Sequence, residues 1–486
     1  MSVFARELAQ INPDPRDRRW LFVPYDQLSD AIGPLSREDP KTLGIVLVEA
    51  PWKAARRPYH KQKLALILSN LRHFALEQAR RGVAVRHVTT TGSYRTALEP
   101  LAKELGLLSV MAPAERELRH DLKPLADSRL LEIVPHEGWL TSPEQFDAVE
   151  KAGPHWRMDA FYRRVRKETG ILMSSGKPEG GKFSFDTSNR QPWRGEPSAP
   201  SPPRFRGNPV TDEVGQLIAD SFAHHPGKLD LTALPSTKDD AETVWTWAQE
   251  QCLEFFGPYE DAMSVRSQGL FHTRISALMN IHRLLPSRVV SDVARMDLPI
   301  ESKEGFVRQV LGWREFVAHV HRSTDGFRTR IKGYSHHITR LMILANIATL
   351  LDVTPRELTD WFWIAYTDAY DWVVEPNVLG MGTFAVGTLM TTKPYVSGAG
   401  YIHRMSDYCS ACAFDPRTNC PITNLYWAFL GRHKRIFSDN PRLTLPLKAL
   451  EKRDQARKGR DRAIFEKLRE NLTRGEPVHP ADLEQL

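Results

Sequence analysis

The hydrophobic pattern of the chain changes its period near the middle, and this change limits the folds that the chain can adopt. Between about residues 18 and 135, short apolar runs alternate with amphipathic segments, the longest of which, 61–82, is a helical pattern ending at Gly82. Such alternation is typical of a parallel α/β sheet. Beyond about residue 240, every pattern is helical. The sequence predicts strands at 19–25, 43–49, 83–88, 107–113 and 130–135.

A long connector separates the two patterns. A helix is predicted near 156–173, and the stretch 174–209, rich in Pro, Gly and Ser, is typical of a loop that crosses the surface. We therefore expect an α/β domain at 1–150, a helix and linker at 151–235, and an all-α domain at 236–486. Helices of the last part are predicted near 240–256, 272–283, 303–321, 334–350, 356–372 and 421–433.

Three of the four cysteines, Cys409, Cys412 and Cys420, lie close together in the sequence. No secretory leader begins the sequence and no run of 18 apolar residues occurs, so we expect a cytoplasmic protein without a membrane segment. In a reducing compartment, a tight group of cysteines favours metal or redox chemistry over disulfides.

Charge and composition narrow the class of ligand. A net charge of +7 and a pI near 9.1 favour a nucleic-acid partner. Twelve tryptophans fit either a large helical core or stacking on a flat cofactor or base. The first strand is not followed by G-x-G-x-x-G, which argues against a dinucleotide in the α/β domain. A ligand of this domain is expected at the carboxyl ends of the strands, near Asp26 and Glu49.

The segment 361–381 carries an aromatic stripe with two acids inside it, Asp368 and Asp371. Such a stripe is common in a helical core, but buried carboxylates without partners are costly, so a functional role stays open. The helix is expected to break at Pro376. On that helix one face would carry Trp361, Asp368 and Trp372, and another Trp363 and Tyr370.

Long stretches of the sequence resemble one family, the photolyase/cryptochrome superfamily, and more closely its bacterial iron–sulfur branch of prokaryotic (6-4) photolyases and related cryptochromes. The resemblance implies an α/β antenna domain, a long linker and an all-helical domain that holds FAD in a bent shape. The stretches that carry it include "DQLS" at 26–29, "HKQK" at 60–63, "FYRRVRKETGILM" at 161–173, "GGKFSFDTSNRQP" at 180–192, "GWREF" at 312–316, "HHITRLM" at 336–342 and "DAYDWVVEPNVLGM" at 368–381.

This resemblance implies light-driven, FAD-dependent repair of UV-induced pyrimidine dimers in DNA, by an electron passed from excited reduced flavin to a flipped-out lesion. The pair His336–His337 makes the (6-4) photoproduct the expected lesion. Two alternatives stay open: a cryptochrome-type blue-light photoreceptor without repair activity, and a cyclobutane pyrimidine dimer photolyase. UV-damaged DNA is the expected partner, and neither a membrane nor an obligate protein partner is expected.

The resemblance also assigns roles to single residues. Arg314 would lie along the flavin, Arg340 would pair with Asp371 beside it, and Asn377 would face flavin N5. The residues expected to hold FAD are Thr273, Ser276, Arg314, Arg340, Asp368, Asp371 and Asn377.

Around the lesion, His337 is the expected proton donor, because the pKa of imidazole lies near neutrality. Lys393 and Arg404 are candidate phosphate contacts. The residues expected at the lesion are His336, His337, Tyr395, Tyr401 and Asp186. Electrons from the surface would reach an oxidised flavin through Trp361, Trp363 and Tyr370.

Three features depart from the family's pattern. Tyr25 and Lys53 replace a small glycine and an acid of the lumazine antenna site, which leaves a different antenna, or none. Phe362 stands where the family has a tyrosine of its electron path. The family's [4Fe–4S] cluster takes a fourth cysteine from an insertion that this chain lacks, and Cys252 matches no ligand position. A cluster with an unusual fourth ligand, a lost cluster and a zinc site therefore all stay open.

Overall fold

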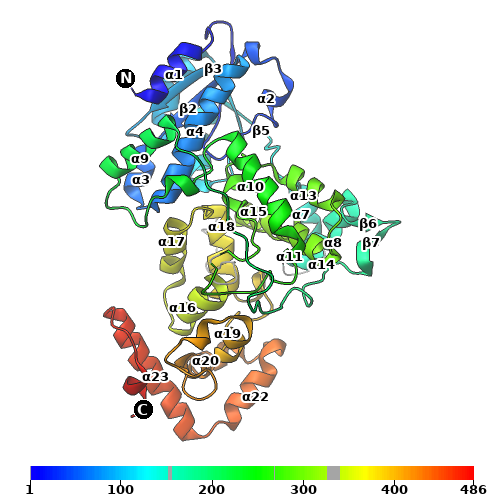
Figure 1. The fold of residues 1–486 in the computed structure, drawn as a ribbon, viewed down its shortest axis with the longest axis vertical. Coiled ribbons are helices and arrows are strands. Elements are labelled where there is room, and N and C mark those ends of the chain that lie inside the picture. Colours follow the sequence, from blue (N-terminus) through cyan, green and yellow to red (C-terminus); the bar gives the residue numbers. More distant parts are fainter. Residues whose placement is uncertain (1, 151–155, 268, 326–339) are drawn as a thin grey trace.

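Five parallel strands form one sheet at the N-terminal end of the elongated molecule (Figure 1). The computed structural model describes residues 2–150, 156–267, 269–325 and 340–486. The strand order is β3-β2-β1-β4-β5, and all five predicted strands are confirmed. They are β1 (Arg19–Phe22), β2 (Leu43–Glu49), β3 (Ala84–Thr89), β4 (Leu108–Met111) and β5 (Leu131–Val134).

Helices flank this sheet as the alternating pattern predicts. The long helix α4 (Lys61–Arg81) ends at Gly82, whose φ of 98° is a left-handed conformation that glycine adopts without steric cost. Its inner face buries residues such as Leu71 and Phe74 beside the sheet. The other helices of this part are α1 (Val3–Ile11), α2 (Pro34–Arg37), α3 (Pro51–Arg56), α5 (Tyr94–Leu105), α6 (Arg116–Asp127) and α7 (Pro143–Glu150).

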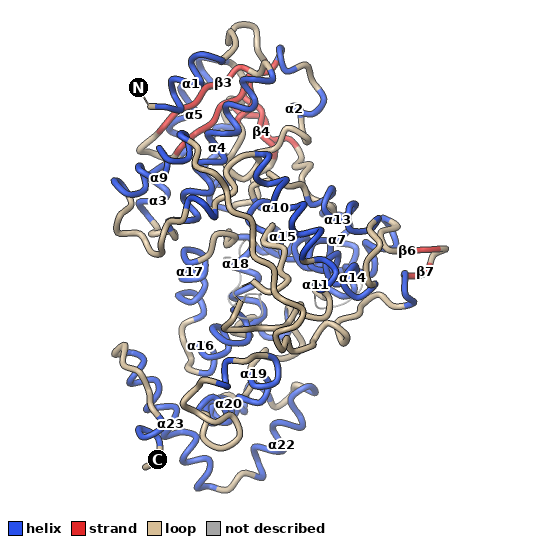
Figure 2. Tube along the Cα trace, viewed as in Figure 1, coloured by secondary structure: helices blue, strands red, loops and turns tan. Residues whose placement is uncertain are grey.

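The connector follows α8 (Met158–Thr169) and the short hairpin of β6 (Met173–Ser174) and β7 (Lys177–Pro178). Figure 2 shows it as a long tan tube that runs over the helical part. The connector ends in a helix that was not predicted from the sequence, α9 (Pro209–Ser221), which packs against α4 and α1. Its Glu213 carboxylate accepts a hydrogen bond from Arg72 of α4 at 2.7 Å. The end of the predicted linker is therefore attached to the sheet domain.

The rest of the chain is helical, as predicted. Two π-helical stretches, Arg308–Arg314 and Asn377–Gly382, continue α14 and α18, and a third covers Arg340–Ala345. The helices are α10 (Lys238–Gln251), α11 (Leu253–Phe256), α12 (Ser276–Asn280), α13 (Pro286–Arg295), α14 (Ile300–Val307), α15 (Glu315–Thr324), α16 (Asn346–Leu350), α17 (Pro355–Ala365), α18 (Asp371–Pro376), α19 (Ala399–Met405), α20 (Pro421–Arg432), α21 (Lys434–Phe437), α22 (Thr444–Lys452) and α23 (Gln455–Thr473).

The single helix predicted at 356–372 is wrong, because α17 ends at Ala365 and α18 begins at Asp371. The buried ammonium of Lys63, on α4, donates hydrogen bonds to the carbonyl oxygens of Trp363, at 3.1 Å, and Ala369. A cation at the end of a helix satisfies carbonyls that have no partner within it. This contact comes from a distant part of the chain, so the local pattern could not show it.

The predicted break at Pro376 is also wrong. Pro376 closes α18, and the chain continues without interruption as the π-helical stretch Asn377–Gly382. Proline lacks the N–H that an α-helix needs and its ring crowds the preceding turn, and a wider π turn is a known way to accommodate such a disturbance. The segment 371–382 therefore stays a rigid wall rather than becoming a loop.

One hydrophobic core runs through the sheet domain and the adjoining helices, including Phe161, Trp245, Phe316 and Trp372. A second core lies at the C-terminal end, where α16, α20, α22 and α23 pack together through residues such as Leu425 and Phe465. Because the first core crosses from the sheet into the helical part, cavities between these two parts have rigid walls.

Gly44→Ala is expected to destabilise the sheet domain by about 1–3 kcal/mol, the usual cost of overpacking. A methyl group at Gly44 on β2 would lie 2.6 Å from a ring carbon of Trp20 on the neighbouring strand. Denaturant unfolding, followed by amide exchange in β1 and β2, measures this loss. The control Gly459→Ala, on the exposed surface of α23 with open space around it, should be neutral or stabilising. Equal loss in both variants would contradict this packing.

Candidate functional site

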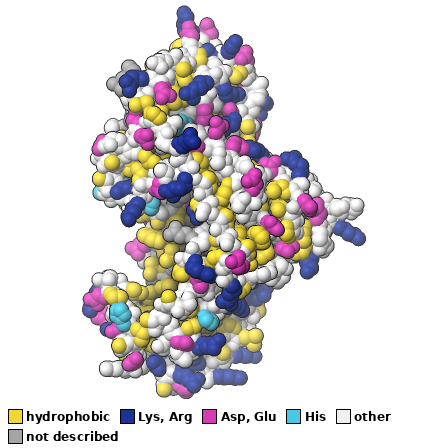
Figure 3. All heavy atoms as spheres, in the orientation of Figure 1, with side chains coloured by type: hydrophobic (Ala, Val, Ile, Leu, Met, Phe, Trp, Pro, Cys, Tyr) yellow, Lys and Arg dark blue, Asp and Glu magenta, His cyan; other side chains and the backbone are white. Residues whose placement is uncertain are grey.

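The connector and the helical part line an open cavity of about 750 Å³. Its walls come from the segment 269–280, the π-helical stretch Arg308–Arg314 and α18, with Pro202–Phe205 of the connector on one side. This volume lies within the range of sites that hold a large small-molecule ligand, roughly 300–1,000 Å³. On the face drawn in Figure 3, hydrophobic side chains gather about halfway along the molecule.

Five of the seven residues expected to hold FAD line this cavity: Thr273, Ser276, Arg314, Asp368 and Asn377. They come from three separate parts of the sequence, so their convergence is a property of the fold. Ser276 donates a hydrogen bond to the Asp368 carboxylate at 3.0 Å, and Asn280 donates to the carbonyl oxygen of Asp368, also at 3.0 Å. The helix α12 and the turn before α18 are thereby joined at one side of the cavity.

Arg314 places a buried positive charge on the cavity wall. Its guanidinium lies 4.4 Å from the ring centre of Trp139 and 5.3 Å from that of Trp372, and donates to Glu315 at 3.0 Å. Burial lowers the pKa of Arg314 from its ordinary value, although the Glu315 carboxylate opposes this shift. Two of its nitrogens, Nε and Nη2, are buried with no hydrogen-bond partner among the described residues.

Two further polar atoms on the same walls lack partners in the described part of the chain: Nε1 of Trp372 and Oδ1 of Asn377. Buried polar groups are normally hydrogen-bonded, and leaving one unpaired costs about 1–3 kcal/mol. Donors and an acceptor that converge on a cavity of this size fit a ligand with both kinds of group. The residues present therefore fit FAD.

The other two predicted FAD residues are placed differently. The Arg340 side chain lies outside what the structure describes, so its expected pairing with Asp371 stays a prediction. Asp371 does not line the cavity; its carboxylate accepts a hydrogen bond from the Arg116 backbone at 2.6 Å and lies 3.8 Å from His321. Burial raises the pKa of Asp371 to about 6.

Three of the five predicted lesion residues, Asp186, Tyr395 and Tyr401, interact electrostatically with one another, but none of them lines this cavity. Tyr395 is 37% exposed; its partial burial raises its pKa, and the negative charge of Asp186 raises the pKa further. Burial, together with the charges of Asp261 and Asp186, raises the pKa of Tyr401 to about 12. His336 and His337 lie outside the described residues.

Asp261, which is not among the residues predicted from the sequence, lines the cavity and lies 3.7 Å from Arg190. Burial beside Glu260 raises the pKa of Asp261 to about 7. No motif pointed to this acid, since its place depends on the fold. The two predicted phosphate contacts, Lys393 and Arg404, are exposed, and Arg404 lies over the Tyr401 ring.

The three clustered cysteines are free thiols near the surface, and Cys252 is buried in another core. Burial raises the pKa values of Cys409 and Cys420, and the charge of Cys412 raises both further. Across the described ranges, no three Cys, His, Asp or Glu side chains are arranged to hold a metal ion. A [4Fe–4S] cluster needs four ligands, which the described residues do not supply in this arrangement.

The rings of the predicted electron path do not contact one another in the described part of the structure. Trp361 is 45% exposed and contacts Phe362 and Tyr366. Trp363 lies under the guanidinium of Arg57 at 4.2 Å. Tyr370 stacks instead on two other rings, those of Tyr25 and Trp372. The expected order Trp361, Trp363, Tyr370 therefore has no continuous ring contact here.

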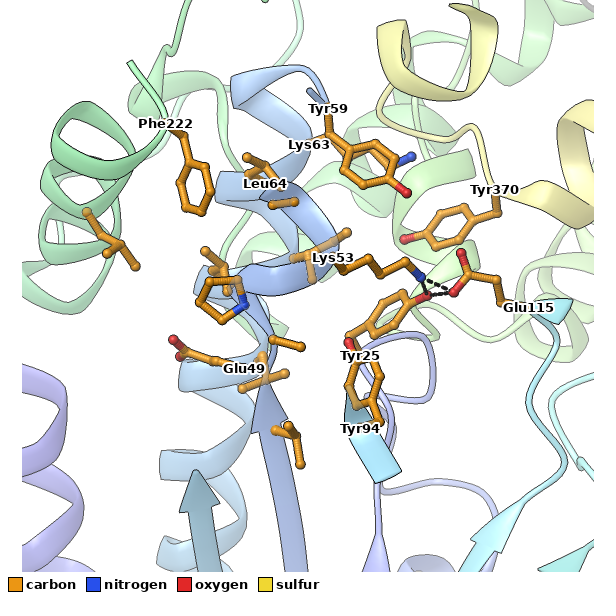
Figure 4. A pocket seen from close by; sticks show the side chains of 18 of the residues that line it. Tyr25, Glu49, Lys53, Tyr59, Lys63, Leu64, Tyr94, Glu115, Phe222 and Tyr370 are labelled. Carbon is orange, nitrogen blue, oxygen red and sulfur yellow. Dashed lines mark hydrogen bonds and ion pairs between the residues drawn. The ribbon is translucent and has the colours of Figure 1, made fainter. Parts of the chain in front are cut away.

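A second, smaller cavity, of about 80 Å³, lies where the carboxyl end of β2 meets α4 and the turn before α18 (Figure 4). Tyr25 donates a hydrogen bond to the Glu115 carboxylate, and Lys53 donates to both of them. Glu49 is held by Arg72 at 2.7 Å and His87 at 3.0 Å. Protein side chains thus fill much of this position, and a space of about 80 Å³ remains.

None of the helices in the described ranges combines the length and the hydropathy that a membrane-spanning segment requires.

Comparison with known proteins agrees with this architecture. A family model described as "Deoxyribodipyrimidine photo-lyase-related protein" matches residues 21–233. An uncharacterised protein of Acanthamoeba polyphaga mimivirus is 41% identical over 104 residues, which cover 21% of this chain and 81% of that protein. The crystal structure of a bacterial class III photolyase from Agrobacterium tumefaciens covers 93% of this chain and 98% of its own, with a TM-score of 0.50. At 14% identity, this likeness shows the fold alone.

A more extensive match in sequence comes from a protein of Agrobacterium fabrum named "(6-4) photolyase". It is 33% identical over 473 residues, which cover 87% of this chain and 93% of the relative. The chain therefore belongs to the photolyase family.

Proposed function

We propose that this chain binds FAD in the 750 Å³ cavity and uses light to repair UV-induced pyrimidine dimers in DNA, preferring the (6-4) photoproduct. The observation that carries the proposal is Arg314, a buried cation on the cavity wall with two nitrogens that lack partners among the described residues. A ligand with acceptor atoms would satisfy these nitrogens and offset the cost of burying the charge. The Agrobacterium relative named "(6-4) photolyase" supports the lesion preference.

The bound flavin would supply light absorption and single-electron chemistry, which ordinary side chains lack. The chain would bind the flavin, hold it in one orientation and exclude water from it. Arg314 and Asn377 offer hydrogen bonds to one part of the ligand, and Trp372 offers an indole N–H. Ser276 and Asp368, fixed by their mutual hydrogen bond, hold another wall. Because these groups are held in place before the ligand binds, little ordering is needed on binding.

On the DNA side, Asp186 is held by Arg190 and by Arg308, whose nitrogen lies 3.4 Å away. This arrangement keeps a carboxylate near Tyr395 and Tyr401, where polar groups of two adjacent, flipped-out pyrimidines could bind. The exposed cations Lys393 and Arg404 would contact phosphates on either side of the lesion. His337 would donate a proton to the damaged base.

Arg314→Met should weaken FAD binding about ten- to a hundredfold, because charge-assisted hydrogen bonds contribute about 1.5–3 kcal/mol. Flavin titration of the purified apoprotein, followed by fluorescence quenching, measures the dissociation constant. Arg322→Met, on the exposed surface of the adjoining α15, is the matched control and should bind flavin as the wild type does. Equal affinity in all three proteins would exclude Arg314 as a flavin contact.

His337→Ala should abolish repair of the (6-4) photoproduct while the bound flavin stays. Oligonucleotides that carry either the (6-4) photoproduct or a cyclobutane dimer are illuminated with reduced protein, and the products are separated by chromatography. Wild-type turnover of the cyclobutane dimer alone would contradict the lesion preference. A flavin-loaded wild type that repairs neither lesion would contradict the enzyme proposal and favour a photoreceptor.

A further inference from the structure

Three stacked aromatic rings join the two cavities of the molecule. Tyr25 and Tyr370 line the small cavity, and their ring centres lie 6.4 Å apart with an angle of 14° between the planes (Figure 4). Tyr370 stacks in turn on Trp372, again at 6.4 Å, with an angle of 25°. Trp372 lines the large cavity beside Arg314. All three side chains are buried, so the row crosses the core from the end of β1 to the proposed flavin site.

The two tyrosines of this row differ in what their hydroxyl groups can do. The Tyr25 hydroxyl donates to the Glu115 carboxylate and accepts a hydrogen bond from Lys53 at 2.7 Å. Burial and the nearby Glu115 charge raise the pKa of Tyr25 well above its ordinary value, so the phenol keeps its proton at neutral pH. The Tyr370 hydroxyl is buried with no hydrogen-bond partner in the described part of the chain.

This difference decides where a positive charge on the row would stay. A phenol that loses an electron becomes a very strong acid, and the oxidised form is stable only if the proton can leave. The Tyr370 hydroxyl has no hydrogen-bond partner among the described residues to take its proton. The Lys63 nitrogen, whose pKa is lowered to about 7 by burial, lies 5.1 Å from the ring centre. Tyr25 has a carboxylate already in place. Tyr370 is therefore suited to pass an electron, and Tyr25 to supply one.

We propose that Tyr25 is the terminal electron donor of a path that runs through Tyr370 and Trp372 to the large cavity. The proposal rests on the proposed binding of FAD there. With FAD bound there and excited by light, Trp372 would pass one electron to the ligand and would be refilled through Tyr370 by one electron from Tyr25. The phenolic proton of Tyr25 moves to the Glu115 carboxylate. The step would leave a neutral tyrosyl radical at Tyr25 and a protonated Glu115, and the bound ligand would hold the transferred electron.

Lys53 and Glu115 form an ion pair and both contact the Tyr25 hydroxyl. Before the electron leaves, their ion pair lies beside the phenol and orients the hydroxyl toward the carboxylate. The transferred proton then neutralises Glu115, while Lys53 keeps its charge. Tyr94, whose ring centre lies 6.2 Å from that of Tyr25, is in contact with this end of the row, but no acceptor for its hydroxyl is found among the described residues. It provides a matched control, since it is a second buried tyrosine of the same cavity that lies off the path.

The test uses the full chain loaded with oxidised FAD, illuminated with blue light and frozen for electron paramagnetic resonance. The wild type should show a tyrosyl radical whose signal narrows when ring-deuterated tyrosine is incorporated. Tyr25→Phe should lose this signal and show a tryptophanyl radical in its place, whereas Tyr94→Phe should keep it. Glu115→Gln retains the phenol ring but removes the proton acceptor, and should also lose the tyrosyl signal.

An unchanged tyrosyl signal in Tyr25→Phe would overturn the assignment. A wild type that binds flavin and accumulates reduced flavin under light without any tyrosyl radical would overturn it as well. A wild type that binds no flavin at all would instead overturn the proposed function, and the path with it. Absorbance of the bound flavin, recorded on the same samples before illumination, separates these failures.

Discussion

The buried ion pair of Arg314 and Glu315 is the contact on which both sides of the proposed site depend. The Glu315 carboxylate accepts hydrogen bonds from the backbone of Leu140 and Thr141, at 2.8 and 3.0 Å, and from the Thr141 hydroxyl. This fixes the chain that leaves the sheet domain against α15, and it places Trp139 on the guanidinium of Arg314. Arg314 in turn faces the large cavity. A buried pair of this kind adds little stability by itself, and its value here is to hold a cation at one defined position.

The contact between the sheet and the helical part also explains why the small cavity has little free space. Lys63, on α4, binds carbonyl oxygens at the break between α17 and α18, so the turn that carries Tyr370 is held against the carboxyl edge of the sheet. Tyr25, Lys53 and Glu115 fill the space that remains. From this edge of the sheet, the stacked rings of Tyr25, Tyr370 and Trp372 lead toward the large cavity.

The spacing of apolar residues along the sequence was enough to predict the parallel sheet, the helix α4 with its end at Gly82, and the helical C-terminal part. The local sequence pattern did not predict elements that depend on contacts with distant parts of the chain. Lys63 binds a carbonyl oxygen near the end of α17, and α9 packs against α1 and α4. For the site, motifs shared with the family indicated Arg314, Asn377 and three other residues that line the cavity. They could not indicate Trp139, Asp261 or the stacking of Tyr370 on Tyr25, because these depend on how separate segments meet.

The most direct test of the account is the amount of flavin released from the purified wild-type chain, measured by absorbance and mass after denaturation. The account predicts FAD in a one-to-one ratio with protein, since the unpaired groups of Arg314, Trp372 and Asn377 converge on a cavity of sufficient volume. Protein that contains no FAD, and takes up none when FAD is supplied in excess, would contradict the proposal that the large cavity binds FAD.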